Sequence, residues 1–321
     1  MIITVTLNAA IDKTLAVPNF RLGQRHRAVE QTAMAGGKGV NVARALRALG
    51  QPVIATGVAG GPTGTRIVEH LTDEGILNDF VRIREESRMS MAVVDPTSGE
   101  QTEINEHGPH VTEAELELFV DKLLYLAKGA AVCVMSGSLP RGVDAGLYGR
   151  VIEEMKRLGV LTVLDSEGEP MNLATRKGPH VVTPNELEAE GLVGHEFSDE
   201  EDRRTGVGEM VELGAREAIM TLPDGCLAML LDPSGERSLY RATLEPLEPV
   251  SSVGSGDAFL AGFVAARYGA RELEDCLRFA VACGAESTQH FGAGVLEQRE
   301  VERLVPDVRV ERLETPALSL G

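Results

Sequence analysis

The sequence predicts one α/β domain, built on a mostly parallel sheet, with a small second sheet. Short apolar runs alternate with helical patterns along most of the 321 residues, which is the pattern of a parallel sheet with crossover helices. A content of 43% hydrophobic residues is enough to bury one large core. Two segments, 15–34 and 88–104, carry strand patterns with no helix between them, and these predict the second sheet.

The main alternation begins at the first residues and continues to residue 266. Strands are expected at 2–7, 53–58, 131–135, 160–164, 180–182, 218–222, 226–231 and 237–241. Helices are expected at 40–49, 64–74, 113–127, 144–158, 185–192, 200–213 and 258–266. The Asp-Pro-Ser-Gly segment at 232–235 is a turn signal, so the last two strands should form a hairpin. After Leu304 we expect a frayed tail.

Two insertions, 13–35 and 87–106, interrupt the alternation. They contain four strand-like runs, at 14–17, 28–34, 89–94 and 101–104. A sheet inserted at the carboxyl ends of parallel strands would lie over the place where open α/β sheets bind ligands. We therefore interpret the insertions as a lid. Two surface hairpins without a role are the alternative.

Composition excludes several classes of partner. The formal net charge of -18 and the pI near 4.9 oppose binding to nucleic acid or to an anionic membrane, because both favour a basic surface. No stretch approaches the roughly 20 apolar residues of a membrane span, and no leader pattern opens the chain, so we expect a cytoplasmic protein. Four cysteines lie among apolar residues without metal-binding spacing, which predicts reduced thiols: Cys133, Cys226, Cys276 and Cys283.

A glycine-rich segment near the end of the chain carries the strongest chemical signal. Residues 251–262, SSVGSGDAFLAG, place Asp257 behind two glycines and at the head of an apolar run. Gly254 and Gly256 allow close approach of the backbone to a ligand, and the free amides that begin a helix favour an anion. Asp257 could then receive a proton from an incoming hydroxyl. An Asp N-cap after a glycine turn explains these residues equally well.

Two segments near the start of the chain could form the other side of such a site. Asp12 follows the first strand, where a carboxylate can bind sugar hydroxyls, although a turn-forming Asp fits as well. Residues 35–44, AGGKGVNVAR, place a glycine run before a helix with an inward Asn41. This run is not a Walker A loop, because Lys38 is followed by Gly39, and it does not match a dinucleotide fingerprint.

Three motifs, in this order along the chain, resemble those of the PfkB (ribokinase-like) carbohydrate kinases: GGKGVNVA at 36–43, SGSLP at 136–140 and VGSGD at 253–257. Three more resemble the branch that acts on phosphorylated ketohexoses, the phosphofructokinases and tagatose-6-phosphate kinase: TLNAAID at 6–12, DSEGE at 165–169 and TPNELE at 183–188. The motifs span nearly the whole chain. The resemblance implies a ribokinase-like three-layer α/β/α fold with a small β-sheet lid.

The resemblance also implies a role for individual residues. Asp257 matches the catalytic base, and the backbone amides that match the anion hole for the γ-phosphoryl group are those of Gly254, Ser255 and Gly256. The residues that match contacts to sugar hydroxyls are Asp12, Gly37 and Asn41. Those that match the region for the substrate's own phosphate are Lys38, Arg88 and Ser138. Arg25 and Arg27 match basic lid residues that reach a neighbouring subunit's site; solvated surface arginines are the alternative.

On the nucleotide side, the resemblance implies an ATP site and a magnesium ion. Asn185 and Glu188 match an Asn-x-x-Glu motif that organises Mg²⁺ through its waters. Residues that match the nucleotide pocket are Thr221, Gly225, Gly284 and Ala285. The chain departs from the family at three places. Ala9 replaces a Pro, Thr183 replaces a Lys, and a usual Gly is missing from the segment TLPDG at 221–225.

The implied reaction is transfer of the γ-phosphoryl group of ATP, with Mg²⁺, to a ketohexose monophosphate. Fructose 1-phosphate, giving fructose 1,6-bisphosphate, is the first expectation. The alternatives are tagatose 6-phosphate, fructose 6-phosphate, or an unphosphorylated sugar or nucleoside. A catalytically silent sensor of sugar phosphate or nucleotide is the alternative outside the enzymes. Lid strands with exposed edges predict a homodimer formed through the lids.

Overall fold

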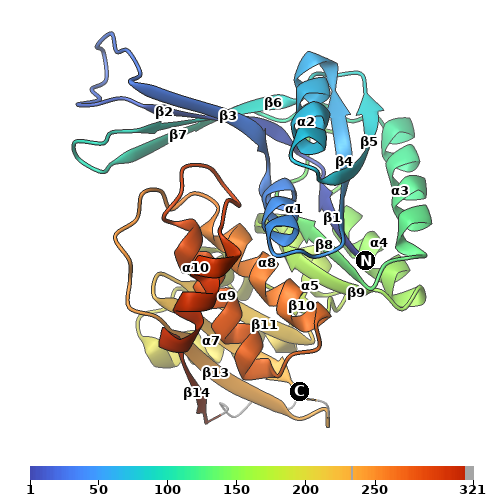
Figure 1. Cartoon of the computed structure of the whole chain (residues 1–321). Helices are drawn as coiled ribbons and strands as arrows, with labels where there is room; N and C mark the ends of the chain where they lie inside the picture. Colours follow the sequence, from blue (N-terminus) through green and yellow to red (C-terminus); the bar gives the residue numbers. More distant parts are fainter. Residues whose placement is uncertain (233, 315–321) are drawn as a thin grey trace.

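The computed structural model describes residues 1–232 and 234–314, and Figure 1 shows a large sheet between helices. The ten strands follow the order β14-β13-β12-β11-β10-β9-β8-β1-β4-β5. The parallel strands are β1 (Ile2–Thr6), β4 (Val53–Gly60), β5 (Leu77–Ile83), β8 (Val132–Ser136), β9 (Leu161–Asp165), β10 (Val181–Val182) and β11 (Glu217–Leu222). An antiparallel edge consists of β12 (Gly225–Leu231), β13 (Arg237–Thr243) and β14 (Arg309–Leu313).

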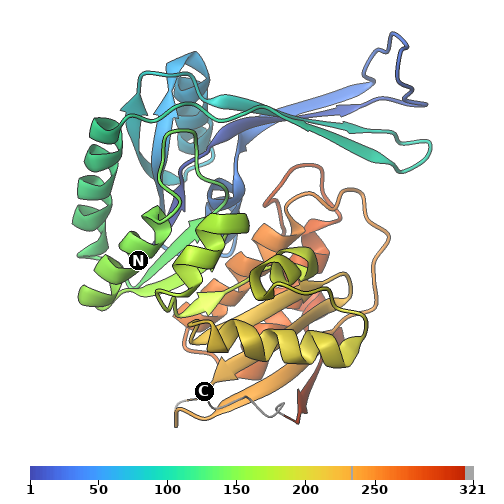
Figure 2. The same cartoon turned by 180° about the vertical axis from the view of Figure 1, so that it is seen from behind.

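Helices cover both faces of this sheet, as the front and back views show (Figures 1 and 2). One face carries α1 (Lys38–Ala48), α2 (Gly61–Asp73), α8 (Ser255–Tyr268), α9 (Leu273–Ser287) and α10 (Gln298–Leu304). The other carries α3 (Glu113–Ala127), α4 (Leu147–Arg157), α5 (Gly168–Thr175), α6 (Glu186–Val193) and α7 (Glu200–Glu212). Each helical layer encloses its own apolar core against the sheet. The predicted three-layer α/β/α fold is confirmed.

The local sequence explains how these layers pack. Along β1, Ile2 belongs to one core while Ile3 and Val5 belong to the other, as the alternation of a strand requires. Helix α8 is buried throughout residues 257–266, which agrees with its apolar composition. It packs against α9 so closely that a Cβ at Gly262 would lie 2.7 Å from Cys283 Sγ. Only glycine permits this approach of the two helices.

The second sheet forms the predicted lid of four strands, in the order β3-β2-β6-β7. Its members are β2 (Ala10–Ala16), β3 (Glu30–Gly36), β6 (Arg88–Val94) and β7 (Gln101–Asn105). Figure 1 shows the lid projecting outward from the three-layer body. The β2 strand begins earlier than expected, so Asp12 lies inside β2, paired with Met34 and Ser90, rather than in a turn. The root of the lid therefore carries Asp12, one of the residues predicted to contact sugar hydroxyls.

The expectation of a frayed tail after Leu304 is wrong for the part that the structure describes. A short 3₁₀ turn (Val305–Asp307) leads into β14, which pairs antiparallel with β13. Residues 315–321 lie outside the described residues, as does Pro233 in the predicted hairpin turn. The hairpin strands themselves, β12 and β13, pair as predicted. Among the described residues, no helix is both long and apolar enough to cross a membrane.

Candidate active site

A cavity of about 800 Å³ opens at the carboxyl ends of β1, β8 and β9, next to the lid root. Its walls come from the main sheet, α1, the start of α8 and the lid strands β2, β6 and β7. It brings together most of the predicted site residues: Asp12, Gly37, Lys38, Asn41, Arg88, Ser138, Asn185, Glu188, Thr221, Gly254, Gly256 and Asp257. Residues predicted from distant motifs thus share one chamber.

The start of α8 separates the two interpretations of Asp257. Gly254 is the N-cap, with φ +78°, and Asp257 is the third residue of the helix rather than its cap. Its carboxylate is 7% exposed and accepts a hydrogen bond from Asn41 Nδ2 at 2.8 Å. A Cβ at Gly254 would lie 2.6 Å from the Ala293 Cβ, whereas one at Gly256 would meet no protein atom within 4 Å. The N-cap interpretation of Asp257 is therefore wrong, and the space beside Gly256 is open to a ligand.

The electrostatic setting of Asp257 suits a proton acceptor. Burial raises the pKa of this carboxyl, and the neighbouring Asp165 carboxylate raises it further. Lys38 and the Asn41 hydrogen bond act in the opposite direction, and the resulting pKa is about 7. A general base is most effective when its pKa lies near the working pH.

Asp12, predicted to contact sugar hydroxyls, lines the cavity beside the lid root. Burial raises the pKa of Asp12, while the charge of Arg88 opposes that rise. A Cβ at Gly36 would lie 1.9 Å from Asp12 Oδ2, so the glycine run makes room for this carboxylate. Arg88 itself donates from Nε to the Asn8 carbonyl oxygen at 3.2 Å, and its remaining N–H groups are available to an anion.

Lys38 lies between two carboxylates in the first cavity. Its Nζ donates to Asp165 Oδ1 at 3.0 Å and to Glu188 Oε1 at 3.2 Å. Burial lowers the pKa of Lys38, but the charges of Asp165 and Glu188 outweigh that effect, so the net pKa rises. Lys38 therefore stays protonated. The sequence motif placed Lys38 with the substrate phosphate, and the structure adds these two acidic partners.

The Asn-x-x-Glu motif begins helix α6 as a capping box. Asn185 Oδ1 accepts from the Glu188 N–H, and Glu188 Oε2 accepts from the Asn185 N–H, each at 2.9 Å. No group of three or more acidic, His or Cys side chains that could hold a metal occurs among the described residues. The donors present, one carboxylate and one amide, fit an ion held mainly by nucleotide phosphates and water.

A second cavity of about 690 Å³ adjoins the first and shares with it the lining residues Asn185, Thr221, Ser252 and Gly256. It is also lined by the remaining predicted nucleotide residues and one predicted anion-hole residue: Gly225, Gly284, Ala285 and Ser255. The start of α8 and the end of β11 therefore lie where the two cavities meet. A ligand in each chamber would place its reactive end near Asp257.

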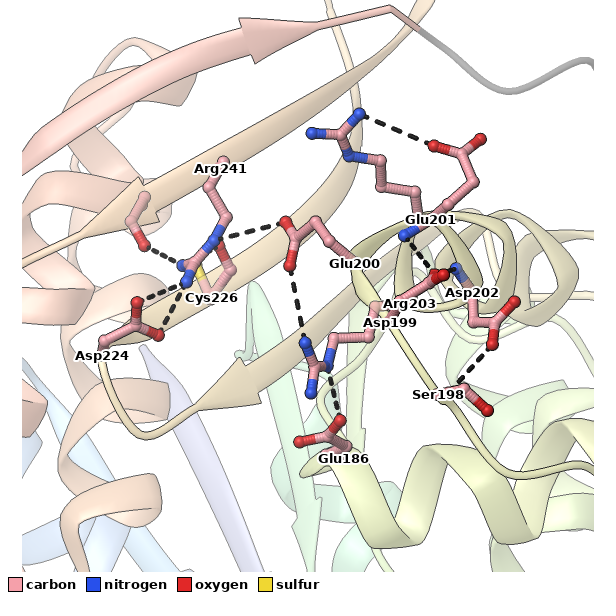
Figure 3. A network of polar contacts seen from close by, with 12 residues as sticks. Glu186, Ser198, Asp199, Glu200, Glu201, Asp202, Arg203, Asp224, Cys226 and Arg241 are labelled. Carbon is pink, nitrogen blue, oxygen red and sulfur yellow. Dashed lines mark hydrogen bonds and ion pairs between the residues drawn. The ribbon is translucent and has the colours of Figure 1, made fainter.

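The segment TLPDG at 221–225, which lacks a glycine expected from the resemblance, forms the β11–β12 turn and is held by an arginine. Arg241 on β13 donates two hydrogen bonds to the Asp224 carboxylate, at 2.7 and 2.6 Å. Figure 3 shows that Arg241 also faces Glu200, which together with Arg203 continues the network to Glu186. The β11–β12 turn is thus held by charge on the rim of the second cavity.

Unpartnered polar atoms concentrate in the first cavity. Seven buried side-chain oxygen or nitrogen atoms of the described residues have no hydrogen-bond partner in the protein, and four of them belong to residues that line this cavity. These four are Thr6 Oγ1, Asn8 Oδ1, Ser136 Oγ and Thr183 Oγ1. Unsatisfied buried polar groups are costly in a closed core, so their clustering fits a chamber built for a polar ligand.

Residues 4–299 match the family model described as "pfkB family carbohydrate kinase". The chain belongs to this family. It is 32% identical to 1-phosphofructokinase of Borreliella burgdorferi over 98% of this chain and 100% of that one. It is 31% identical to tagatose-6-phosphate kinase of Staphylococcus epidermidis, over 97% and 99% of the two chains.

Solved structures agree with this assignment. Phosphofructokinase-2 of Escherichia coli, in complex with substrates and products, matches with a TM-score of 0.88 and 28% identity, over 95% of this chain and 98% of that one. Another structure of that enzyme is described as a tetrameric inhibited form. The chain is thus a carbohydrate kinase of the pfkB family, and its fold overlaps that of this neighbour over nearly its whole length.

Two predicted residues lie apart from this kinase's own cavity. Arg25 and Arg27 are exposed in the loop between β2 and β3, at the outer end of the lid, and line neither chamber. Other lining residues were not predicted from the sequence: Glu103, Asn105, His107, Arg141 and Asp165. Of these, Asp165 carried a usable signal, because it ends a buried strand at the edge where ligands bind. The lid residues carried none, since exposed polar residues on a strand face are common.

Proposed function

We propose that this pfkB kinase transfers the γ-phosphoryl group of ATP to a primary hydroxyl of a ketohexose monophosphate. Fructose 1-phosphate, giving fructose 1,6-bisphosphate, is the proposed substrate, and the cytoplasm is the proposed compartment. The observation that carries the proposal is the buried Asp257 carboxylate, which lines the first cavity directly after Gly256, a residue that lines both cavities. The 1-phosphofructokinase named among the relatives supports the choice of sugar.

In the proposed mechanism, the sugar hydroxyl attacks the γ-phosphorus in line with the bridging oxygen of ADP. The new O–P bond forms as the bond to ADP breaks, and Asp257 takes the hydroxyl proton. Backbone amides of Gly254, Ser255 and Gly256 surround the transferring group. The Gly256 amide, in the first turn of α8, has no backbone acceptor among the described residues and is free to donate, whereas the Ser255 amide donates to the Ser252 carbonyl oxygen at 3.3 Å.

The sugar phosphate is proposed to bind through Arg88, with Ser138 and Lys38 nearby. Arg88 is suited to this role because a guanidinium can donate two hydrogen bonds to phosphate oxygens. Asp12, Gly37 and Asn41 would contact the sugar hydroxyls. A local cluster of cations is needed because the net charge of -18 would otherwise repel the substrate.

The nucleotide is proposed to occupy the second chamber, beside Thr221, Gly225, Gly284 and Ala285. When bound, Mg²⁺ would neutralise charge on the nucleotide phosphates, and the side chains proposed to hold its waters are Asn185 and Glu188. Lys38 connects this region to the sugar side, because it contacts Glu188 as well as Asp165.

A kinase for tagatose 6-phosphate is the second candidate, because a relative of that name is nearly as similar as the 1-phosphofructokinase. Initial rates across fructose 1-phosphate, fructose 6-phosphate, tagatose 6-phosphate and fructose separate the candidates. We expect the highest kcat/KM with fructose 1-phosphate. Arg88→Ala should lose more activity on the phosphorylated sugars than on fructose, and an equal loss on both would contradict the phosphate role of Arg88.

The catalytic role is tested with Asp257→Asn. We expect turnover to fall by about 10² to 10⁴-fold, the usual contribution of a general base, while the protein still binds a nucleotide analogue. A variant that keeps turnover within a few fold of wild type would overturn the mechanism. Absence of ATP consumption by the wild-type protein with every sugar in the panel would favour the silent sensor.

We also propose a homodimer formed through the lids. The lid exposes large apolar side chains at its outer end, with Leu22 at 89% and Val29 at 71% exposure. Its order β3-β2-β6-β7 leaves β3 and β7 as free edges within the described chain. Pairing two lids would bury both features. Arg25 and Arg27, in the same loop as Leu22, are proposed to lie next to the first cavity of the other subunit.

A further inference from the structure

Arg44 is a buried arginine on α1 whose five N–H groups all have acceptors. Its exposure is 8%. Nε donates to Glu74 Oε2 at 2.5 Å, and Nη2 donates to Glu74 Oε1 at 3.0 Å and to the Ala35 carbonyl oxygen at 2.6 Å. Nη1 donates to the Ala293 carbonyl oxygen at 2.9 Å and to Asn41 Oδ1 at 3.2 Å. A guanidinium has five N–H donors, so these five bonds use every one.

The bond to Asn41 decides which way the Asn41 amide faces. An amide carries one acceptor oxygen and one donor nitrogen, and an arginine can only donate. Arg44 therefore holds Oδ1, which leaves Nδ2 to donate to Asp257 Oδ2 at 2.8 Å. The opposite orientation would place Oδ1 against the Asp257 carboxylate, and two acceptors repel each other. Arg44 thus makes Asn41 a hydrogen-bond donor to Asp257.

The two backbone acceptors of Arg44 belong to segments on either side of the reacting centre. Ala35 lies in β3, one residue before the end of that strand at the lid root. Ala293 packs on the N-cap of α8, where a Cβ at Gly254 would lie within 2.7 Å of the Ala293 Cα. One guanidinium therefore connects the lid root with the first turn of the helix that carries Asp257.

We propose that Arg44 is a positioning residue for phosphoryl transfer, which orients the Asn41 amide toward Asp257 and ties the lid root to the start of α8. This inference rests on the proposed function, in which Asp257 is the base. Arg44 itself lines neither chamber, so it acts through Asn41 and through the backbone that it holds.

The test is the pH dependence of kcat/KM for Arg44→Met. Loss of the fixed donor should raise the pKa of Asp257, and the acid limb of the profile should move to higher pH by about 1 unit, the size of a lost hydrogen bond to a charged group. The phosphates of the free substrates titrate identically in assays of wild type and variant, so a difference between the two pH profiles arises from ionisable groups of the enzyme. Arg47→Met, at an exposed arginine of the same helix, is the matched control and should not move the limb.

The other charged groups that face Asp257 are Asp165 on β9, Lys38 on α1 and Asp12 on β2. None of them is substituted in this comparison, but Arg44→Met removes a charge that lowers the pKa of Asp12, so the Asn41→Ala variant is the one that isolates the bond to Asp257. A general loss of structure would lower kcat/KM at every pH and leave the limb in place. A shifted limb therefore separates a positioning role from a merely structural one.

A double variant tests whether Arg44 acts through Asn41. Asn41→Ala should shift the limb in the same direction, and combining it with Arg44→Met should add no further shift. Full additivity, or an unmoved limb in a folded Arg44→Met protein, would overturn the inference. If Arg44→Met fails to fold by circular dichroism, Arg44→Lys keeps the charge and should show a smaller shift in the same direction.

The outcome is distinguishable from a failure of the proposed function. An Asp257→Asn protein with near wild-type turnover would remove the base and with it the premise of this inference. An inactive Asp257→Asn protein, combined with an unmoved limb in the folded Arg44 variants, would leave the proposed function standing and reject only the role of Arg44.

Discussion

Burial of the Asp257 carboxyl makes the stability of the protein depend on pH. Its folded-state pKa of about 7 exceeds the ordinary aspartate pKa of 3.8, so the native state holds a proton that the unfolded state has already released between about pH 4 and pH 7. The contribution of this group is therefore most favourable below about pH 4 and is lost as the pH rises to about 7. Asp257→Asn, which has no charge to bury, should be more stable than wild type at pH 8 by about 4 kcal/mol.

Urea unfolding at pH 8 and pH 4.5 measures this difference. The gain should shrink at the lower pH, because the wild-type carboxyl is then largely protonated in the native state. Asp121→Asn, on the exposed side of α3, is the matched control and should change stability little at either pH. An equal gain at both pH values, or a loss at pH 8, would contradict the prediction.

Two glycines in helices should respond to alanine in opposite directions. A Cβ at Gly262 would lie 2.7 Å from Cys283 Sγ and 3.1 Å from the Ala280 Cα, so Gly262→Ala should force α8 and α9 apart and destabilise the protein by about 1–3 kcal/mol. Gly191 in α6 meets no atom within 4 Å. Gly191→Ala should stabilise by about 0.5–1 kcal/mol through helix propensity. Thermal unfolding of both variants tests the pair, and equal signs would contradict it.

At the scale of the element, the charged network in Figure 3 should control nucleotide affinity, because it holds the β11–β12 turn in place. Arg241 holds Asp224 by two hydrogen bonds, and the residues on either side of Asp224 line the second cavity. Arg241→Leu should release the turn and raise the KM for ATP by about 10-fold, or ~1.4 kcal/mol. The KM for the sugar phosphate should stay within about twofold.

Steady-state kinetics with each substrate varied in turn measures both values. The control is Arg312→Leu, on the neighbouring strand β14, where the arginine is exposed and pairs with Glu236 at 3.2 Å. It should leave both KM values unchanged. A parallel rise of both KM values in Arg241→Leu would show that the turn supports the whole site rather than the nucleotide chamber.

The elements that the sequence predicted best are those with a strong local pattern. Helix α3 has the expected bounds, since Thr112 and Glu115 form a capping box at its start. The lid strands and α8 were predicted within a few residues, because their sequences also have a strong local pattern. Strand β5 was not predicted, because Asn78, Asp79 and Arg82 interrupt its apolar residues at the edge of the sheet.

In the candidate site, too, the local features could be predicted from the sequence and the contacts between remote residues could not. The glycine turns could be predicted because each depends on neighbouring residues alone. The contact between Asn41 and Asp257 could not, since 216 positions separate them and only the packing of α1 against α8 brings them together. The two acidic partners of Lys38 are also remote in sequence, at separations of 127 and 150.

At the scale of the whole molecule, the lid should decide the oligomeric state. Leu22→Asp replaces the most exposed leucine of the lid loop by a charge and should convert the proposed dimer to a monomer, with a mass near 34.3 kDa by light scattering at micromolar concentration. Leu118→Asp, at an exposed leucine of α3, is the matched control and should keep the dimer mass. A monomeric wild-type protein, or a dimer that survives Leu22→Asp, would reject assembly through this surface.

The pairing of β14 with β13 has a practical consequence for anyone who shortens the chain. A truncation after Leu304 would uncover the backbone N–H and C=O groups of Leu239–Thr243, which β14 now occupies. An unprotected strand edge is a template for association with other chains. The charged residues of β14, Arg309, Glu311 and Arg312, make it a poor template itself, so we expect removal of the segment that was predicted to be a frayed tail to promote aggregation.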